Sequence, residues 1–147
     1  MDNKYLSALG RTEKQFDSLY REAAAEFGLS HCAMWVLYNI ANSAEPLSQQ
    51  DLVDIMMFPK QTINSAVMGL SESGLVTLEP IPNTKNRKRI LLTDKGQELA
   101  DDTVIRLTNA ELRAVAAMGE EKMKQFVTLY CEFFDDLKSG FEQEGLL

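Results

Sequence analysis

The sequence predicts a mainly α-helical fold with one small β-hairpin: a winged helix-turn-helix flanked by N-terminal and C-terminal helices. Three observations lead to this fold class. Apolar residues recur at the helical period along most of the 147 residues. The pattern becomes strand-like only between residues 75 and 93. Glycines, prolines and capping residues divide the helical stretches into separate helices.

The first two predicted helices cover residues 4–27 and 31–44. The first has one apolar face and ends at Gly28, a residue suited to the left-handed backbone that often follows a helix. Ser30 is a suitable N-cap for the second helix, HCAMWVLYNIANSA. That helix is apolar almost all round, so we expect it to be buried.

Two more helices follow, separated by a break at Phe58 and Pro59. Ser48 and Asp51 have the spacing of a capping box, with the shorter acid, at the start of the third helix. Pro59 suits the first position of a fourth helix over residues 59–73, where the N–H that proline lacks would be unbonded anyway. The expected inward residues are Leu52, Ile55 and Met56 in the third helix and Ile63, Val67 and Leu70 in the fourth.

A hairpin is predicted after the fourth helix. The segments LVTLE and RILLT are rich in strand-forming residues, and PIPNTKNRK between them carries turn residues and a basic cluster. Thr93 and Asp94 then start a long helix that runs to about residue 117. Gly119 separates it from a last helix over residues 120–141.

The formal net charge of −7 taken alone disfavours a nucleic-acid partner, because duplex binding draws affinity from neutralising phosphates. The distribution of charge reverses this inference. Residues 58–96 contain six Lys or Arg and three acids, a net charge of +3, so the remaining residues sum to −10. A basic centre between acidic flanks is expected when only the centre contacts an anion.

The second helix of a helix-turn-helix pair enters the major groove of DNA, and the hairpin reaches the adjacent groove or the backbone. Amide, hydroxyl and ammonium groups on the outward side of the fourth helix have the chemistry for reading bases. The hairpin tip carries four cations within residues 83–89. The alternative is an ordinary solvated surface. The expected DNA-binding residues are Lys60, Gln61, Thr62, Asn64 and Ser65 on the helix and Lys85, Arg87 and Lys88 on the hairpin.

The segments TINSAVMGLSESGLV and ILLTDKG are similar in order and spacing to the MarR family of bacterial transcriptional regulators. The resemblance covers nearly the whole chain. It implies a homodimer that reads an inverted repeat, and repression that responds to a ligand. It also implies one unit over residues 1–147, with dimerisation helices at 1–28 and 97–147 and a winged DNA-binding lobe at 29–96.

The chain departs from the family pattern at two places. Many members have Asp-x-Arg in the wing, where this chain has Thr84 and Asn86, so Lys85 or Arg87 would have to substitute. Relatives often have basic residues in the fourth helix where this chain has Ser65, Gly69 and Ser73. A glycine inside a helix costs roughly 1 kcal/mol relative to alanine, so Gly69 suggests a close approach of the backbone to another group.

The last predicted helix carries a broad aromatic stripe on an otherwise acidic rod. This stripe and the apolar face of residues 6–27 exceed what a small winged core can cover, which predicts a two-fold homodimer. The alternative is that both helices fold back on their own winged lobe. The expected interface residues are Phe16, Phe126, Tyr130, Phe134, Leu137 and Phe141.

The resemblance also implies a small aromatic effector, bound where the dimerisation helices meet the winged lobe. The candidate residues are His31, Trp35 and Tyr38, with plain core packing as the alternative. Cys32 and Cys131 are expected to be buried, inert thiols. A redox role for Cys32 is an alternative, because a helix start can lower a thiol pKa, although its apolar neighbours oppose this.

No paired-carboxylate, Ser-His-Asp, Walker or glycine-rich cofactor motif is found, so we expect a DNA-binding regulator without a cofactor and not an enzyme. One histidine and two distant cysteines predict neither a metal site nor a disulfide framework. Without a signal sequence or a long apolar run, a cytoplasmic protein with no membrane partner is expected. The expected partners are double-stranded DNA, a second copy of the chain and a small aromatic effector. The rival class is a winged-helix protein-interaction module without DNA binding.

Overall fold

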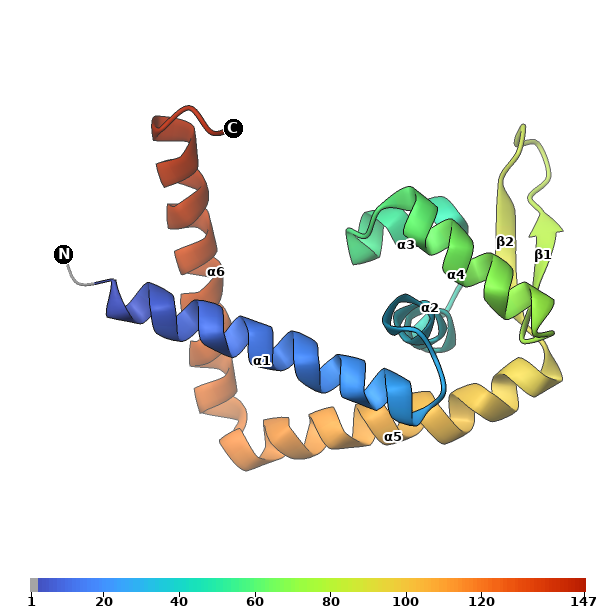
Figure 1. Ribbon diagram of the computed structural model, residues 1–147, viewed down its shortest axis with the longest axis horizontal. Coiled ribbons are helices and arrows are strands. Elements are labelled where there is room, and N and C mark those ends of the chain that lie inside the picture. Colours follow the sequence, from blue (N-terminus) through green and yellow to red (C-terminus); the bar gives the residue numbers. More distant parts are fainter. Residues whose placement is uncertain (1–2) are drawn as a thin grey trace. The chain divides into compact units, whose positions relative to one another are not determined.

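The computed structural model describes residues 3–147. By their contacts the residues divide into two units, the first ending at Leu107 and the second running from Thr108 to Leu147. The helices and the antiparallel hairpin confirm the predicted fold class (Figure 1). The elements are α1 (Lys4–Glu26), α2 (His31–Asn42), α3 (Gln49–Met56), α4 (Lys60–Glu72), β1 (Val76–Pro80), β2 (Lys88–Leu92), α5 (Asp94–Met118) and α6 (Glu120–Gln143).

The predicted caps define the helix starts. Ser30 Oγ accepts a hydrogen bond from the Ala33 N–H at 3.1 Å at the start of α2. Ser48 and Asp51 form a complete capping box on α3. These contacts satisfy N–H groups that the first turn of a helix leaves unbonded. Pro59, predicted at the first position of the fourth helix, is instead the N-cap residue, and α4 begins one residue later at Lys60.

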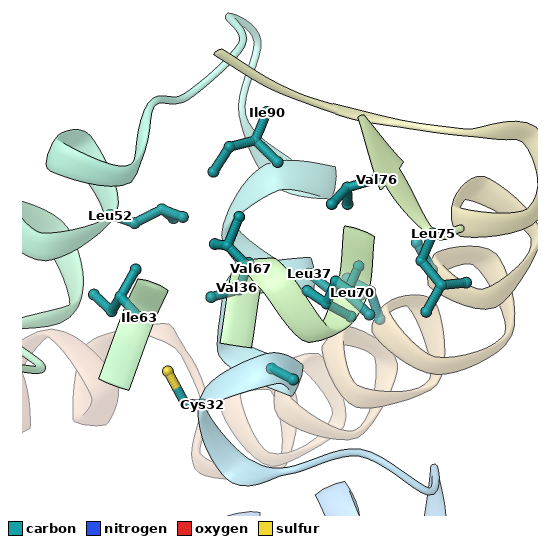
Figure 2. Packing of buried hydrophobic residues seen from close by; sticks show 13 residues of the cluster. Cys32, Val36, Leu37, Leu52, Ile63, Val67, Leu70, Leu75, Val76 and Ile90 are labelled. Atoms are coloured by element: carbon teal, nitrogen blue, oxygen red, sulfur yellow. The ribbon is translucent and has the colours of Figure 1, made fainter. Parts of the chain in front are cut away.

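The larger of two buried clusters lies where α2, α3, α4 and the hairpin meet, and it includes Ala100 and Val104 of α5 (Figure 2). Val36 and Leu37 of α2 are fully buried, as its apolar composition predicted. The inward face of α4 is also as predicted, with Ile63 and Val67 fully buried and Leu70 3% exposed. Because three inward residues of α4 are fixed in this core, the opposite face of that helix points to solvent.

Ile55 is not on the inward stripe of α3, and that part of the prediction is wrong. Leu52 is fully buried and Met56 half-buried, whereas Ile55 is 54% exposed. Leu52 and Met56 are one helical turn apart and share a face, and Ile55 lies to one side of it. Val53 also packs against the core from the other side of Leu52.

The hairpin lies against the rest of the lobe along one edge. β1 pairs with β2 in register, with Leu78 opposite Ile90. The other edge of β2 is joined to the segment before α3, since the Ile90 N–H donates to the Leu47 carbonyl oxygen at 2.8 Å. The base of the hairpin is therefore fixed by main-chain hydrogen bonds on both sides of β2.

Two helical glycines have opposite surroundings. A Cβ at Gly96, near the start of α5, would overlap the carbonyl oxygen of Leu75. A Cβ at Gly69 in α4 would meet no atom within 4 Å. The close approach expected at Gly69 is therefore absent within residues 3–147, and Gly96 is where it occurs.

The second unit consists of the end of α5, from Thr108, and α6. Gly119 separates the two helices and has a positive φ of 82°, which favours glycine. No residue of α6, which is described throughout, is buried in the single chain. Within residues 3–147 no helix is both long and apolar enough to span a membrane.

Candidate nucleic-acid interface

The outward face of α4 presents the side chains predicted to read bases. Lys60, Gln61, Thr62, Asn64 and Ser65 are all exposed. They alternate with the buried residues Ile63 and Val67, so their direction follows from the core packing. The sequence pattern therefore predicted correctly that these side chains of α4 are exposed.

A groove of about 570 Å³ runs between this face of α4 and the hairpin. We call it the wing groove. Five of the eight predicted DNA-binding residues line it: Lys60, Asn64, Lys85, Arg87 and Lys88. Met68, on the outward side of α4, and Thr84 and Asn86, in the basic hairpin tip, also line the groove and lie in the segments predicted to bind DNA. No sequence signal pointed to the other four lining residues, Ser48, Gln49, Gln50 and Leu78.

The other three predicted residues lie on a different side of α4. Gln61, Thr62 and Ser65 line a cavity of about 710 Å³ together with Arg21 and His31. The predicted surface is thus wider than the wing groove. It continues around the start of α4 toward α1 and α2.

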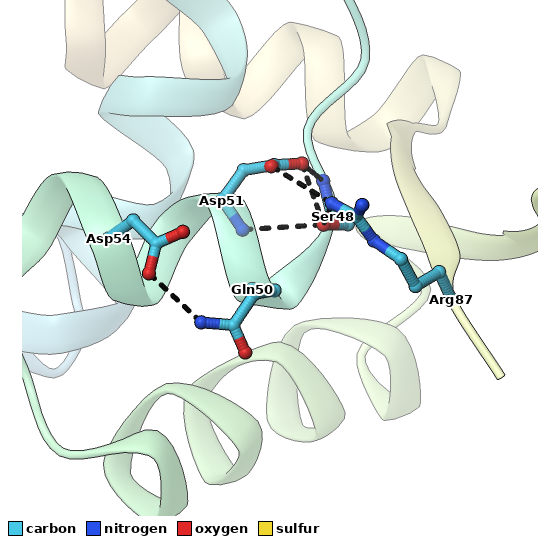
Figure 3. Close-up of polar contacts among 5 residues, drawn as sticks. All are labelled: Ser48, Gln50, Asp51, Asp54 and Arg87. Carbon is cyan, nitrogen blue, oxygen red and sulfur yellow. Dashed lines mark hydrogen bonds and ion pairs between the residues drawn. The ribbon is translucent and has the colours of Figure 1, made fainter. Parts of the chain in front are cut away.

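The cations of the hairpin differ in their contacts. Arg87 Nη2 lies 3.1 Å from Ser48 Oγ and 3.1 Å from Asp51 Oδ1, at the start of α3 (Figure 3). Arg89 pairs with Glu79 on the opposite strand at 2.8 Å. Lys85 and Lys88 are exposed beside them. The side chains predicted to bind phosphate therefore include one, Arg87, that is already engaged within the chain.

The capping box also changes the acidity of Asp51. Hydrogen bonds from the hydroxyl and the backbone N–H of Ser48, together with the positive charge of Arg87, lower the pKa of the Asp51 carboxyl below its usual value. Both hydrogen bonds are short, at 2.6 Å from the hydroxyl and 2.8 Å from the N–H. Asp51 therefore stays ionised at neutral pH.

A second cavity, of about 410 Å³, brings the predicted effector residues His31, Trp35 and Tyr38 together. We call it the aromatic cavity. The rings of Trp35 and Tyr38 lie 5.2 Å apart, and those of Tyr20 and Trp35 4.9 Å apart. Its other lining residues are Phe16, Asp17, Asn39, Ile55, Met56 and Phe58. Phe16, predicted at the dimer interface, thus borders this cavity and is 55% exposed.

The two cysteines differ, which corrects the expectation that both are buried. Cys131 on α6 is exposed. Cys32 is buried, and its Sγ lies 3.8 Å from the Thr62 carbonyl oxygen. Burial raises the pKa of the Cys32 thiol. The lowering of this pKa that a helix start can cause therefore does not dominate at the start of α2. A thiol of this kind is a poor nucleophile at neutral pH.

The fold and the exposed face of α4 define a winged helix-turn-helix protein with long flanking helices. Residues 27–85 match the model of the MarR family, which confirms the resemblance drawn from the sequence. No curated protein sequence matches the chain closely enough to indicate a relative.

Several solved structures share the fold across almost the whole chain. A MarR family regulator from Neisseria meningitidis is 16% identical, with a TM-score of 0.81 over 98% of this chain and 99% of that one. MepR from Staphylococcus aureus, solved as a DNA complex, is 17% identical, with a TM-score of 0.74 over 92% and 99%. Staphylococcus aureus MarR, solved with salicylate and kanamycin, is 17% identical, with a TM-score of 0.71 over 93% and 92%.

Proposed function

We propose that this chain is a transcriptional regulator that acts in the cytoplasm by binding duplex DNA and catalyses no reaction. In this proposal a homodimer represses transcription from an inverted-repeat operator, and a small aromatic effector modulates the binding. The observation that carries the proposal is the wing groove, where a polar helix face and a basic hairpin lie side by side.

The exposed face of α4 supplies base-reading chemistry. Asn64 and Gln61 can each form a bidentate pair with adenine, and Lys60 can reach the acceptors of guanine. Thr62 and Ser65 can serve bases or phosphates. All five side chains are exposed on α4 and free of the core, which supports their insertion into a major groove.

The hairpin side supplies positive charge. Lys85 and Lys88 are exposed at the mouth of the groove, so they can neutralise phosphates or enter a minor groove. Arg87 is the third predicted contact, and its guanidinium already contacts Ser48 and Asp51 at the start of α3. The DNA complex of MepR, which shares the fold, supports the same mode of action here.

A second copy of the chain is the partner that best explains the exposed apolar residues. Along α6 the aromatic stripe is open in the single chain, with Leu137 40% and Phe134 63% exposed. The rings of Phe126 and Tyr130 stack at 5.8 Å within it. Burying such a stripe against its symmetry mate yields a two-fold dimer, which matches an operator with two half-sites.

The aromatic cavity supports the effector part of the proposal. Its rings offer stacking surfaces, and Asn39 and His31 add polar groups, a combination typical of small-ligand sites. The fold relative solved with salicylate provides a first probe to try. Because Trp35 is the sole tryptophan, binding of salicylate in this cavity would change its fluorescence.

The decisive experiment is selection of duplexes from a random pool by the purified protein, followed by affinity measurements over a range of salt concentrations. We expect a preferred site with inverted-repeat symmetry and an affinity that falls steeply with salt. A protein-interaction module without DNA binding, which the acidic net charge favours, would bind no duplex even at low salt.

A further inference from the structure

The loop of the wing, residues 81–87, is joined to the start of α3 by the side chain of Arg87. Its Nη2 carries two N–H groups, one for Ser48 Oγ and one for Asp51 Oδ1. These contacts span 39 and 36 positions of the sequence, so they connect two separate parts of the lobe. Figure 3 shows the guanidinium beside the capping box.

The two acceptors are held in place by the capping box itself. Ser48 is 2% exposed, and its hydroxyl donates to Asp51 Oδ2 at 2.6 Å. Asp51 Oδ2 also accepts the Ser48 N–H at 2.8 Å. Arg87 therefore binds a rigid pair of oxygens and not two mobile surface side chains.

The backbone of Arg87 closes the wing loop by a hydrogen bond, while its side chain attaches the same loop to the start of α3. The Ile81 N–H donates to the Arg87 carbonyl oxygen at 2.9 Å, and Thr84 Oγ1 donates to the Ile81 carbonyl oxygen at 2.8 Å. The closed loop carries Lys85. A movement of Arg87 would therefore move the loop and its lysine together.

Arg89 provides an internal comparison. It also forms an exposed ion pair, but its partner Glu79 lies directly opposite in the hairpin, so this pair stays within the wing. Among the wing cations with an ion pair in residues 3–147, Arg87 alone reaches another element. Its positive charge is also largely offset by the ionised Asp51.

We infer that Arg87 is a positioning residue. It fixes the wing loop against the start of α3, so that Lys85 and Lys88 meet DNA in a set orientation, and it does not itself neutralise a phosphate. This inference rests on the proposed DNA binding for its consequence, but the attachment of the loop can be measured without DNA.

The first measurement is amide hydrogen exchange of residues 81–87 in the free, full-length protein. Arg87→Ala is expected to accelerate exchange by about two- to fivefold, the ratio that corresponds to an exposed ion pair of ordinary strength. Asp51→Asn should do the same, because asparagine keeps an oxygen for the Ser48 N–H but lacks the charge that holds Arg87. The matched control Arg89→Ala removes a cation from the same hairpin and should leave loop exchange unchanged.

The second measurement is the affinity for a selected duplex as a function of salt. Arg87→Ala and Asp51→Asn should each weaken binding by about two- to fivefold, because fewer molecules have the wing in place, and the double variant should be no weaker than either single one. The slope of log affinity against log salt concentration should stay the same, because Lys85 and Lys88 still neutralise the same phosphates.

A direct role of Arg87 at a phosphate predicts different results. Arg87→Ala would lower the salt slope by about one for each phosphate that the guanidinium neutralises, and Asp51→Asn would strengthen binding because it removes a nearby negative charge. Either of these results, or unchanged loop exchange in Arg87→Ala, overturns the inference. If the wild type binds no duplex at low salt, the proposed function fails, and loop exchange still decides whether Arg87 fixes the wing.

Discussion

The indole Nε1 of Trp35 donates a hydrogen bond to Nε2 of His31 at 3.0 Å. An imidazole nitrogen that accepts a hydrogen bond carries no proton, so His31 is neutral in this arrangement. Groups around His31 shift its pKa in both directions. Burial and the charge of Arg21 lower the pKa of His31, while Asp17, with a carboxylate oxygen 4.0 Å from Nε2, raises it. The net effect is a pKa below the usual 6.5.

Acidification should therefore disrupt this pair. We expect the fluorescence of Trp35 to titrate with a midpoint below 6.5, as His31 becomes protonated and its hydrogen bond from the indole is broken. The pKa of His31 is lower in the folded state than in the unfolded state. The contribution of neutral His31 to folding stability is therefore complete above pH 6.5 and is lost as the pH falls through the folded pKa. His31→Gln should abolish the fluorescence titration. It should also abolish the part of the pH dependence of folding stability that comes from His31. A midpoint above 6.5 in the wild type would contradict the assignment.

The two sides of the wing groove should contribute differently to DNA binding. Asn64→Ala should lower the affinity for the preferred site by about 1 to 3 kcal/mol and leave binding to a scrambled duplex almost unchanged. Lys85→Ala should weaken both duplexes equally and reduce the salt slope by about one for each phosphate that the ammonium group neutralises. Titrations of both duplexes at several salt concentrations separate the two effects. Equal weakening of both duplexes by Asn64→Ala would exclude base reading at this position.

A charge in the aromatic stripe of α6 should prevent dimerisation. Phe134→Asp or Leu137→Asp would bury an unpaired carboxylate in the proposed interface, which is strongly destabilising, and should abolish both self-association and DNA binding. Thr128→Asp is the matched control, because a rotation of about 100° per residue places Thr128 on the other side of the helix. Sedimentation at micromolar concentration checks both. A variant with a charged stripe that still sedimented as a dimer would show that the interface lies elsewhere.

The two helical glycines should respond in opposite directions to alanine. Gly96→Ala is expected to destabilise the fold by about 1 to 3 kcal/mol, because the methyl group would displace the backbone at Leu75. Gly69→Ala should stabilise it by about 0.5 to 1 kcal/mol, since the added methyl group meets open space and alanine favours the helix. Denaturant unfolding without DNA measures both. A decrease in stability in Gly69→Ala would reveal a contact at this position that the single chain does not contain.

The sequence was sufficient to predict those structural features that depend on a single helix or a single turn. The spacing of Ile63, Val67 and Leu70 fixed the buried side of α4 and with it the exposed side, and Ser48 with Asp51 fixed the start of α3. Periodicity within one helix, or a cap within one turn, is local information that a sequence displays directly.

The sequence was insufficient where distant segments meet. Nothing in the spacing of Arg87 indicates that it pairs with Asp51, because the pairing depends on how the hairpin lies on α3. The same applies to Gly96: it has no room for a side chain because of Leu75, a residue between α4 and β1 that is distant in the sequence. Ile55 was misplaced because eight residues of helix give too few turns for the pattern to distinguish its core side from its flank.

Phe58 lies between the aromatic cavity and the cavity beside Gln61 and lines both. Its ring is 5.9 Å from that of His31, and Pro59 and the first residue of α4 follow it directly in the chain. A molecule that displaced this ring from one side would change the room on the other side and, through Pro59, would shift the start of α4. Such a coupling is reciprocal: the factor by which an occupant lowers the affinity for DNA is the factor by which DNA lowers the affinity for the occupant. One shared aromatic wall would thus make the operator itself an antagonist of the effector.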